Sequence, residues 1–93
     1  MPEAKTAILT GGSGFLGSHF IKGLSKNHHS IYVLDTKPLG KKLITEFSNL
    51  DLEYFNVNVS EENEVVNFFE SIKDRDILLT TLINAAASNP AVS

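Results

Sequence analysis

Short apolar runs alternate with longer amphipathic stretches along the chain. The length and composition of the apolar runs predict β-strands at residues 4–10, 31–34, 52–57 and 77–83. Between them, apolar side chains at helical spacing predict helices from about residue 14 to 26, 36 to 50 and 61 to 73. Strands that alternate with helices of this length predict an α/β fold with one parallel sheet and right-handed crossovers.

The second and third expected helices have recognisable starts and apolar faces. Thr36 and Pro38 would open the second, because proline is tolerated in a first helical turn, and its apolar side would be Leu39, Leu43, Ile44, Phe47 and Leu50. Ser60 would cap the third helix, with Glu61 and Glu62 near its positive end. Its inward face would be Val65, Phe69 and Ile72, with Val66 and Phe68 flanking it.

A glycine-rich turn joins the first expected strand to the first expected helix. Gly11, Gly14 and Gly17 have the spacing of a dinucleotide-binding turn, and the strand before them and the helix after them make that spacing informative. Gly11 would permit the tight turn, Gly14 would let a pyrophosphate approach the backbone, and Gly17 would let the helix pack close to the sheet. A turn that serves chain reversal alone is the alternative.

The start of the first helix supplies the expected phosphate donors. Backbone N–H groups near Phe15 and Leu16 would face the negative phosphates, and the hydroxyl of Ser13 could add a further donor. A Walker-type phosphate loop is excluded, because such a loop needs Gly-Lys-Ser or Gly-Lys-Thr, whereas Ser18 and His19 follow Gly17 here.

Asp35 ends the second expected strand, eighteen residues after Gly17. A carboxylate at this place can accept both hydroxyls of an adenosine ribose and would repel a 2′-phosphate, which favours NAD over NADP. Lys37, Lys41 and Lys42 lie near enough in sequence to leave NADP open. A role for Asp35 in capping the next helix is compatible with the same position.

Composition narrows the function classes. The 93 residues suit a single domain over residues 1–93, and a net charge of −3 with eight Lys plus Arg argues against nucleic acid and against an anionic membrane surface as partners. The chain has no cysteine and shows no signal peptide or transmembrane run, so we expect a cytoplasmic protein.

Four segments together resemble the cofactor half of a short-chain dehydrogenase/reductase: Thr10 to Gly17, Asp35, Asn58 to Ser60, and Leu82 to Ala87. The resemblance covers essentially the whole chain. The glycine spacing, with Ser18 and His19 after it, is most similar to the extended subgroup of nucleotide-sugar epimerases and dehydratases. The segment from Asn84 to Ala87 stands where classical members carry Asn-Asn-Ala-Gly and extended members a His-Leu-Ala-Ala type, and it matches neither fully.

The resemblance implies a partial three-layer Rossmann-type fold with strand order 3-2-1-4 and further cofactor contacts. Asn58 stands where the family usually has an Asp that contacts the adenine amino group, and its amide oxygen could still accept there. Val59 would contribute a backbone contact, and Asn84, Ala85 and Ala86 would border the adenosine ribose. Small residues at that last position could instead make room for a neighbouring helix.

Family enzymes pair a catalytic Tyr with a Lys four residues later, and neither tyrosine here fits. Tyr32 is followed at that spacing by Thr36 and Tyr54 by Asn58, so both are expected to be packing residues. We therefore expect a truncated, catalytically incomplete part of an NAD(P)-dependent oxidoreductase or sugar-nucleotide-modifying enzyme. A non-catalytic nucleotide-binding module is the alternative.

The remaining polar residues are expected to lie at the surface. This applies to the charged connection at residues 73–76 and to His19, His28 and His29, which lack the ligand spacing of a metal site. The apolar run at residues 77–83 would present an unpaired sheet edge, so we expect the chain to self-associate.

Overall fold

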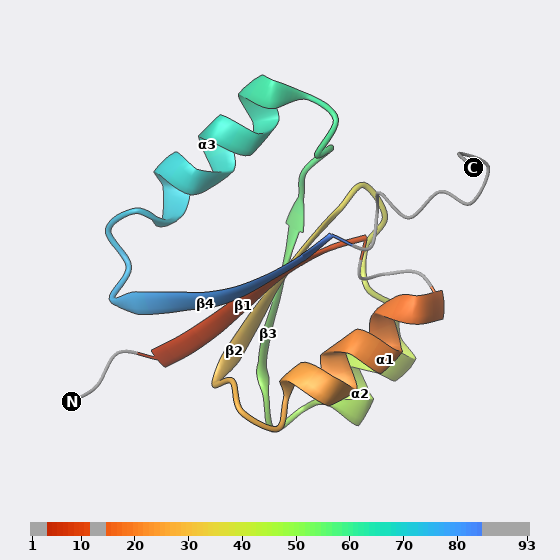
Figure 1. The fold of residues 1–93 in the computed structure, drawn as a ribbon. Helices are drawn as coiled ribbons and strands as arrows, with labels where there is room; N and C mark the ends of the chain where they lie inside the picture. Colours follow the sequence, from red (N-terminus) through yellow and green to blue (C-terminus); the bar gives the residue numbers. More distant parts are fainter. Residues whose placement is uncertain (1–3, 12–14, 85–93) are drawn as a thin grey trace.

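A computed structural model describes residues 4–11 and 15–84. Strands and helices alternate along it: β1 (Ala4–Thr10), α1 (Phe15–Leu24), β2 (Ser30–Asp35), α2 (Lys41–Glu46), β3 (Asp51–Asn56), α3 (Glu62–Ile72) and β4 (Ile77–Asn84). The strands form one parallel sheet in the order β3-β2-β1-β4 (Figure 1). The predicted α/β class and strand order are confirmed.

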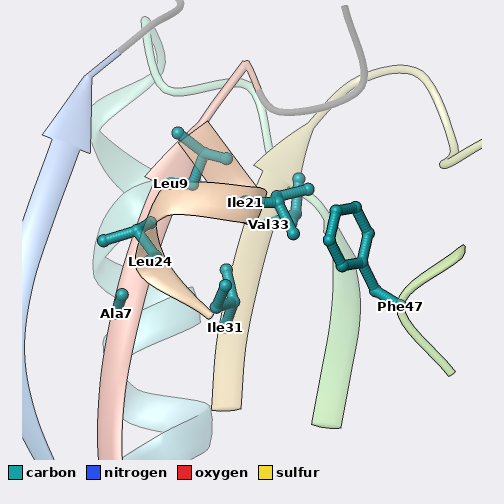
Figure 2. Packing of buried hydrophobic residues seen from close by; sticks show 7 residues of the cluster. All are labelled: Ala7, Leu9, Ile21, Leu24, Ile31, Val33 and Phe47. Carbon is teal, nitrogen blue, oxygen red and sulfur yellow. The ribbon is translucent and has the colours of Figure 1, made fainter. Parts of the chain in front are cut away.

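The helices lie on both faces of the sheet, α1 and α2 on one and α3 on the other (Figure 1). On the first face, Ala7, Leu9, Ile31 and Val33 pack with Ile21, Leu24 and Phe47, as Figure 2 shows. On the second face, Ile8, Tyr32 and Leu34 pack with Val57, Phe68 and Ile72. Because β1 and β2 bury side chains in both directions, residues 7–9 of β1 and 31–34 of β2 are apolar runs without alternation.

Strand β4 lies at the edge of the described sheet and contains one extra residue. Thr6 is opposite Leu79 and Ala7 is opposite Thr81, which leaves Thr80 as a bulge. His28 connects this bulge to the end of α1: its Nδ1 lies 2.9 Å from the carbonyl of Leu24 and its Nε2 lies 2.8 Å and 3.0 Å from the hydroxyls of Thr80 and Thr81. His28 is therefore a half-buried structural contact and not the expected surface residue.

Helix α2 is much shorter than predicted. The chain is still extended at Gly40 (φ −73°, ψ 155°), so Thr36 and Pro38 precede the helix and do not open it. Proline disfavours helical geometry at the residue before it, and glycine is a poor helix former, which explains the late start. Leu43 packs on the core as expected, whereas Ile44 is 52% exposed.

Helix α3 starts later and is rotated relative to the prediction. Its N-cap is Glu61, because the Ser60 hydroxyl instead donates to the amide oxygen of Asn58 at 2.7 Å. Phe68 is buried and Phe69 is 40% exposed, the reverse of what we expected. The Phe68 ring makes edge contacts with Phe55 at 4.9 Å and Tyr32 at 6.5 Å, and these aromatic contacts account for the rotation.

The connection from α3 to β4 is exposed, as predicted, but Arg75 in it makes contacts that the sequence did not suggest. Its Nη1 and Nη2 donate to the two carboxylate oxygens of Glu53 at 2.9 Å and 3.2 Å, and Nη1 also donates to the Tyr32 hydroxyl at 3.0 Å. The guanidinium carbon lies 5.3 Å from the Tyr32 ring centroid. The hydrogen bonds to Glu53 and Tyr32 raise the pKa of Arg75 above its ordinary value.

Candidate dinucleotide-binding site

The carboxyl ends of all four strands carry residues that we predicted for the site. Gly11 follows β1, Asp35 ends β2, Asn58 follows β3 and Asn84 ends β4. Because the strands are parallel, these positions lie along one edge of the sheet. Open α/β sheets bind their ligands outside this edge.

Part of the glycine turn lies within the described residues. Gly11 has a φ of 76°, which favours glycine, and its N–H donates to the carbonyl of Leu34 at 2.9 Å. Phe15 and Leu16 form the first turn of α1, where N–H groups lack helical partners, and Gly17 is buried within the same helix. Ser13, Gly14, Ala85 and Ala86 lie outside the described residues.

A hollow of about 90 Å³ opens at this edge. Four residues predicted for the site line it, namely Gly11, Asp35, Asn58 and Val59. Leu34, Thr36 and Val57 complete the lining. The structure thus brings together residues that are up to 48 positions apart in the sequence.

The end of β2 that carries Asp35 is fixed by its neighbours. The Asp35 carbonyl accepts hydrogen bonds from the Val57 N–H at 3.2 Å and from the Tyr54 hydroxyl at 3.0 Å. Its carboxylate accepts from the Lys37 N–H at 3.2 Å, so it orders a turn and does not cap α2, which begins at Lys41. Tyr54, which we expected to pack in the strand, thus also positions the end of β2 through its hydroxyl.

Two side-chain oxygens, one from a carboxylate and one from an amide, accept the hydrogen bonds that order the loop after β3. The N–H of Asn58 donates to Glu64 Oε1 at 2.8 Å, and the Asn58 amide oxygen accepts from the N–H and the hydroxyl of Ser60 at 3.0 Å and 2.7 Å. Sequence reasoning missed Glu64, although a Glu early in a helix that reaches back to an upstream N–H is a known capping signal. Asn58 was expected to offer its amide oxygen to adenine, and this oxygen already accepts two hydrogen bonds.

Asn84 is joined to β1 at the same edge. The Thr10 hydroxyl donates to the Asn84 amide oxygen at 2.7 Å, and Thr10 is buried. This contact fixes the end of β4 beside the glycine turn. The sequence predicted Thr10 as the end of the first strand and the start of the turn motif, and did not indicate this contact.

The tyrosines have structural partners. The Tyr32 hydroxyl accepts from Arg75 and the Tyr54 hydroxyl donates to Asp35, so neither is arranged with a lysine for proton transfer.

In residues 4–11 and 15–84 no cluster of three or more metal-ligating side chains occurs. Over the same ranges, no helix has the length and apolar character needed to cross a bilayer.

Comparison with known proteins decides the family. The model of the NAD-dependent epimerase/dehydratase family matches residues 7–93. The chain belongs to this family. A Methanocaldococcus jannaschii protein that is provisionally named a UDP-glucose 4-epimerase is 30% identical over 74 residues, which cover 77% of this chain and 22% of that relative. The epimerase/dehydratase chain thus spans about a fifth of the relative's length.

Solved structures share the fold of this epimerase/dehydratase chain. A ketoreductase domain from the bacillaene assembly line superimposes with a TM-score of 0.72 and 25% identity, over 90% of this chain and 22% of that chain. A Haemophilus influenza protein provisionally described as a D-mannonate oxidoreductase, with bound NAD, gives a TM-score of 0.70 and 25% identity, over 86% of this chain and 30% of that chain. A short-chain dehydrogenase from Leptospira borgpetersenii also shares the fold, with a TM-score of 0.70 and 23% identity over 89% of this chain and 31% of that chain, in agreement with the resemblance noted in the sequence.

Proposed function

We propose that this chain binds NAD along the carboxyl edge of its sheet, as the nucleotide-binding part of an NAD(P)-dependent oxidoreductase or nucleotide-sugar epimerase or dehydratase. The observation that carries the proposal is the hollow that Gly11, Asp35, Asn58 and Val59 line together. The family match and the NAD bound to the Haemophilus neighbour support it.

Each proposed contact follows from the chemistry of the residue. The pyrophosphate would lie against the glycine turn, near Ser13, Gly14 and the N–H groups of Phe15 and Leu16. The adenosine ribose would bind to the Asp35 carboxylate, which disfavours the 2′-phosphate of NADP. Asn84, Ala85 and Ala86 would border the same cofactor from the end of β4. Bound NAD would supply hydride transfer, while these residues bind and orient it.

In this proposal, the residues that catalyse the reaction belong to a longer protein of which this chain is the nucleotide-binding part. The chain covers 22% of its Methanocaldococcus relative. The hydroxyl of Tyr32 is hydrogen-bonded to Arg75 and that of Tyr54 to the Asp35 carbonyl, so both tyrosines have structural roles. A readout of binding is therefore the appropriate test of this chain.

Gly14→Val tests the proposal directly. A valine side chain at the expected point of backbone approach would block the pyrophosphate, so NAD binding in calorimetry should be lost. Gly23→Val is the matched control, because a Cβ at Gly23 at the far end of α1 meets nothing within 4 Å. Unchanged NAD affinity in a Gly14→Val variant that retains its circular dichroism spectrum would overturn the proposal.

We also propose that the 93-residue chain self-associates through β4. In the described sheet β4 pairs with β1 alone, and Leu78, Leu79 and Leu82 are 44%, 43% and 66% exposed. An open apolar strand edge favours pairing with another chain. Sedimentation should show concentration-dependent dimers, which Leu82→Lys should weaken and which Ile44→Lys, at a 52% exposed position on α2, should not. A monomer at every concentration would contradict this.

A further inference from the structure

A second hollow, of about 320 Å³, lies where the edge strand β3 meets helix α3. Its volume is within the range of small-molecule sites, which begins at roughly 300 Å³. Val57 is the lining residue that it shares with the hollow at the carboxyl edge of the sheet. The groups that a ligand would meet here come from six other residues, namely Phe55, Asn56, Glu64, Asn67, Phe68 and Ser71. This hollow is therefore distinct from the proposed dinucleotide site.

Glu64 brings a carboxylate to this second hollow with part of its bonding capacity unused. Its Oε1 accepts a hydrogen bond from the Asn58 N–H at 2.8 Å. Among residues 4–11 and 15–84, no cation and no other donor bonds to this carboxylate. A carboxylate has about four lone pairs on its two oxygens, so Oε2 remains available as an acceptor. Because Glu64 is half-buried, water screens its charge less than it would at an exposed position, and a positive ligand group is the partner that it attracts.

The rest of the lining also suits a positive group. Phe55 and Phe68 supply aromatic rings, whose negative faces attract cations. The guanidinium carbon of Arg75 already lies 5.7 Å from the Phe55 ring centroid. The Ser71 hydroxyl donates to the Phe68 carbonyl at 2.6 Å, so its oxygen is left to accept. Among the described residues that line this hollow none is a lysine, arginine or histidine, so an anion would find no opposite charge there.

We propose that the second hollow binds a small organic cation, a primary ammonium group on an apolar body. The ammonium group pairs with the Glu64 carboxylate, and the apolar body packs against the rings of Phe55 and Phe68. A bare metal ion does not fit the lining, because within residues 4–11 and 15–84 no three metal-ligating side chains come together and the rings would stay unused. The proposal is independent of the dinucleotide site, since NAD would bind in the other hollow.

Probes that share a phenylethyl body and differ in the charge of the end group test the proposal: phenethylammonium, 2-phenylethanol and 3-phenylpropionate. Each is titrated into the whole chain while NMR follows the backbone amide resonances of Asn67, Phe68 and Ser71. The cation should shift these resonances saturably and bind roughly fivefold more tightly than the alcohol, the effect of a partly exposed ion pair and a cation–ring contact. The anion should bind more weakly than the alcohol. Equal affinities for the cation and the alcohol, or no saturable shift with the cation, would overturn the proposal.

Glu64→Gln separates the charge of this carboxylate from the shape of the hollow. Glutamine keeps a side-chain oxygen for the Asn58 N–H, so phenethylammonium should bind about fivefold more weakly while the affinity for 2-phenylethanol is unchanged. Glu62→Gln is the matched control, because it removes the same charge from the same helix at an exposed position outside the lining, and cation affinity should stay within about twofold of the wild type. Equal losses in the two variants would show a response to net charge alone and would refute the site. If Glu64→Gln lost its circular dichroism spectrum, the three probes on the wild-type chain would decide.

Discussion

The polar groups at the two ends of strands β2 and β3 differ in what they bind. Toward the amino ends, Arg75 donates to both oxygens of Glu53 and to the Tyr32 hydroxyl, so the cluster is closed on itself. At the carboxyl ends, Asp35 and Asn58 line a hollow. A closed polar cluster contributes to stability, whereas groups that line a hollow can serve a ligand.

The division has a structural basis. Helix α3 runs from the carboxyl edge back to the amino edge, so the Arg75 that follows it is carried over the aromatic rings of Tyr32 and Phe55, at 5.3 Å and 5.7 Å. At the other edge, short turns after the strands leave side chains beside an opening. Mutations at the two ends should therefore separate stability from binding.

Of the substitutions that compare these two ends, Asp35→Ala is expected to have the largest effect. Loss of the charged acceptor for the ribose should weaken the free energy of NAD binding by about 2 kcal/mol, roughly a thirtyfold loss of affinity. It should also reduce the preference for NAD over NADP. Calorimetry with both dinucleotides measures this, and urea unfolding should show little change. If Asp35→Ala instead lowered the free energy of unfolding and bound NAD normally, Asp35 would have a role in stability and not in binding.

Arg75→Ala, in contrast to Asp35→Ala, should lower stability and not NAD binding. Loss of a half-exposed bidentate pair and of the ring contacts should lower the free energy of unfolding by about 1–2 kcal/mol and leave NAD affinity unchanged. Because the folded state raises the pKa of Arg75, this contribution is fully present at neutral pH and would decline only at extreme alkaline pH.

Arg75→Lys is the matched control in the same urea titrations, because lysine retains the charge but cannot bind Glu53 through two nitrogens. It should recover only part of the loss. Full recovery by lysine would show that charge alone, and not the bidentate geometry, stabilises this end.

The smallest effect is expected from Tyr54→Phe, which removes a hydroxyl that supports the carboxyl end of β2. The Tyr54 hydroxyl donates to the carbonyl of Asp35, so its loss should cost about 1 kcal/mol of stability and weaken NAD binding only twofold to threefold. Tyr32→Phe removes a hydroxyl that accepts from Arg75 and should alter stability alone. Equal binding by both variants would show that the Asp35 carbonyl needs no such support.

The strands and the glycine turn could be predicted from sequence because their signals are local. The run Ile31 to Leu34 is apolar throughout since both faces of β2 are covered, and Gly11 has the positive φ that such a turn requires. The strand order came from the family resemblance. The bounds of each strand differ from the predicted ones by at most one residue at either end, where pairing with neighbouring strands decides the last residue.

The features that sequence missed depend on contacts between distant residues. Arg75 and Glu53 are 22 positions apart, so nothing near Arg75 distinguishes it from the charged residues beside it. Phe68 and Phe69 are adjacent aromatic residues, and only the rings of Tyr32 and Phe55 determine which one is buried. Ser60 could serve a helix or a preceding side chain, and competition for its hydroxyl decided between them.

The bulge at Thr80 gives β4 two independent registers. Residues before it are matched to Ala4–Thr6 and residues after it to Ala7–Thr10, with the change of phase confined to one position. An insertion or deletion in the connection from α3 can therefore be absorbed at Thr80 without moving Asn84 from its place opposite Thr10. The part of β4 that ends at Asn84, beside Thr10, thus keeps its own register with β1 whatever the register of the residues before Thr80.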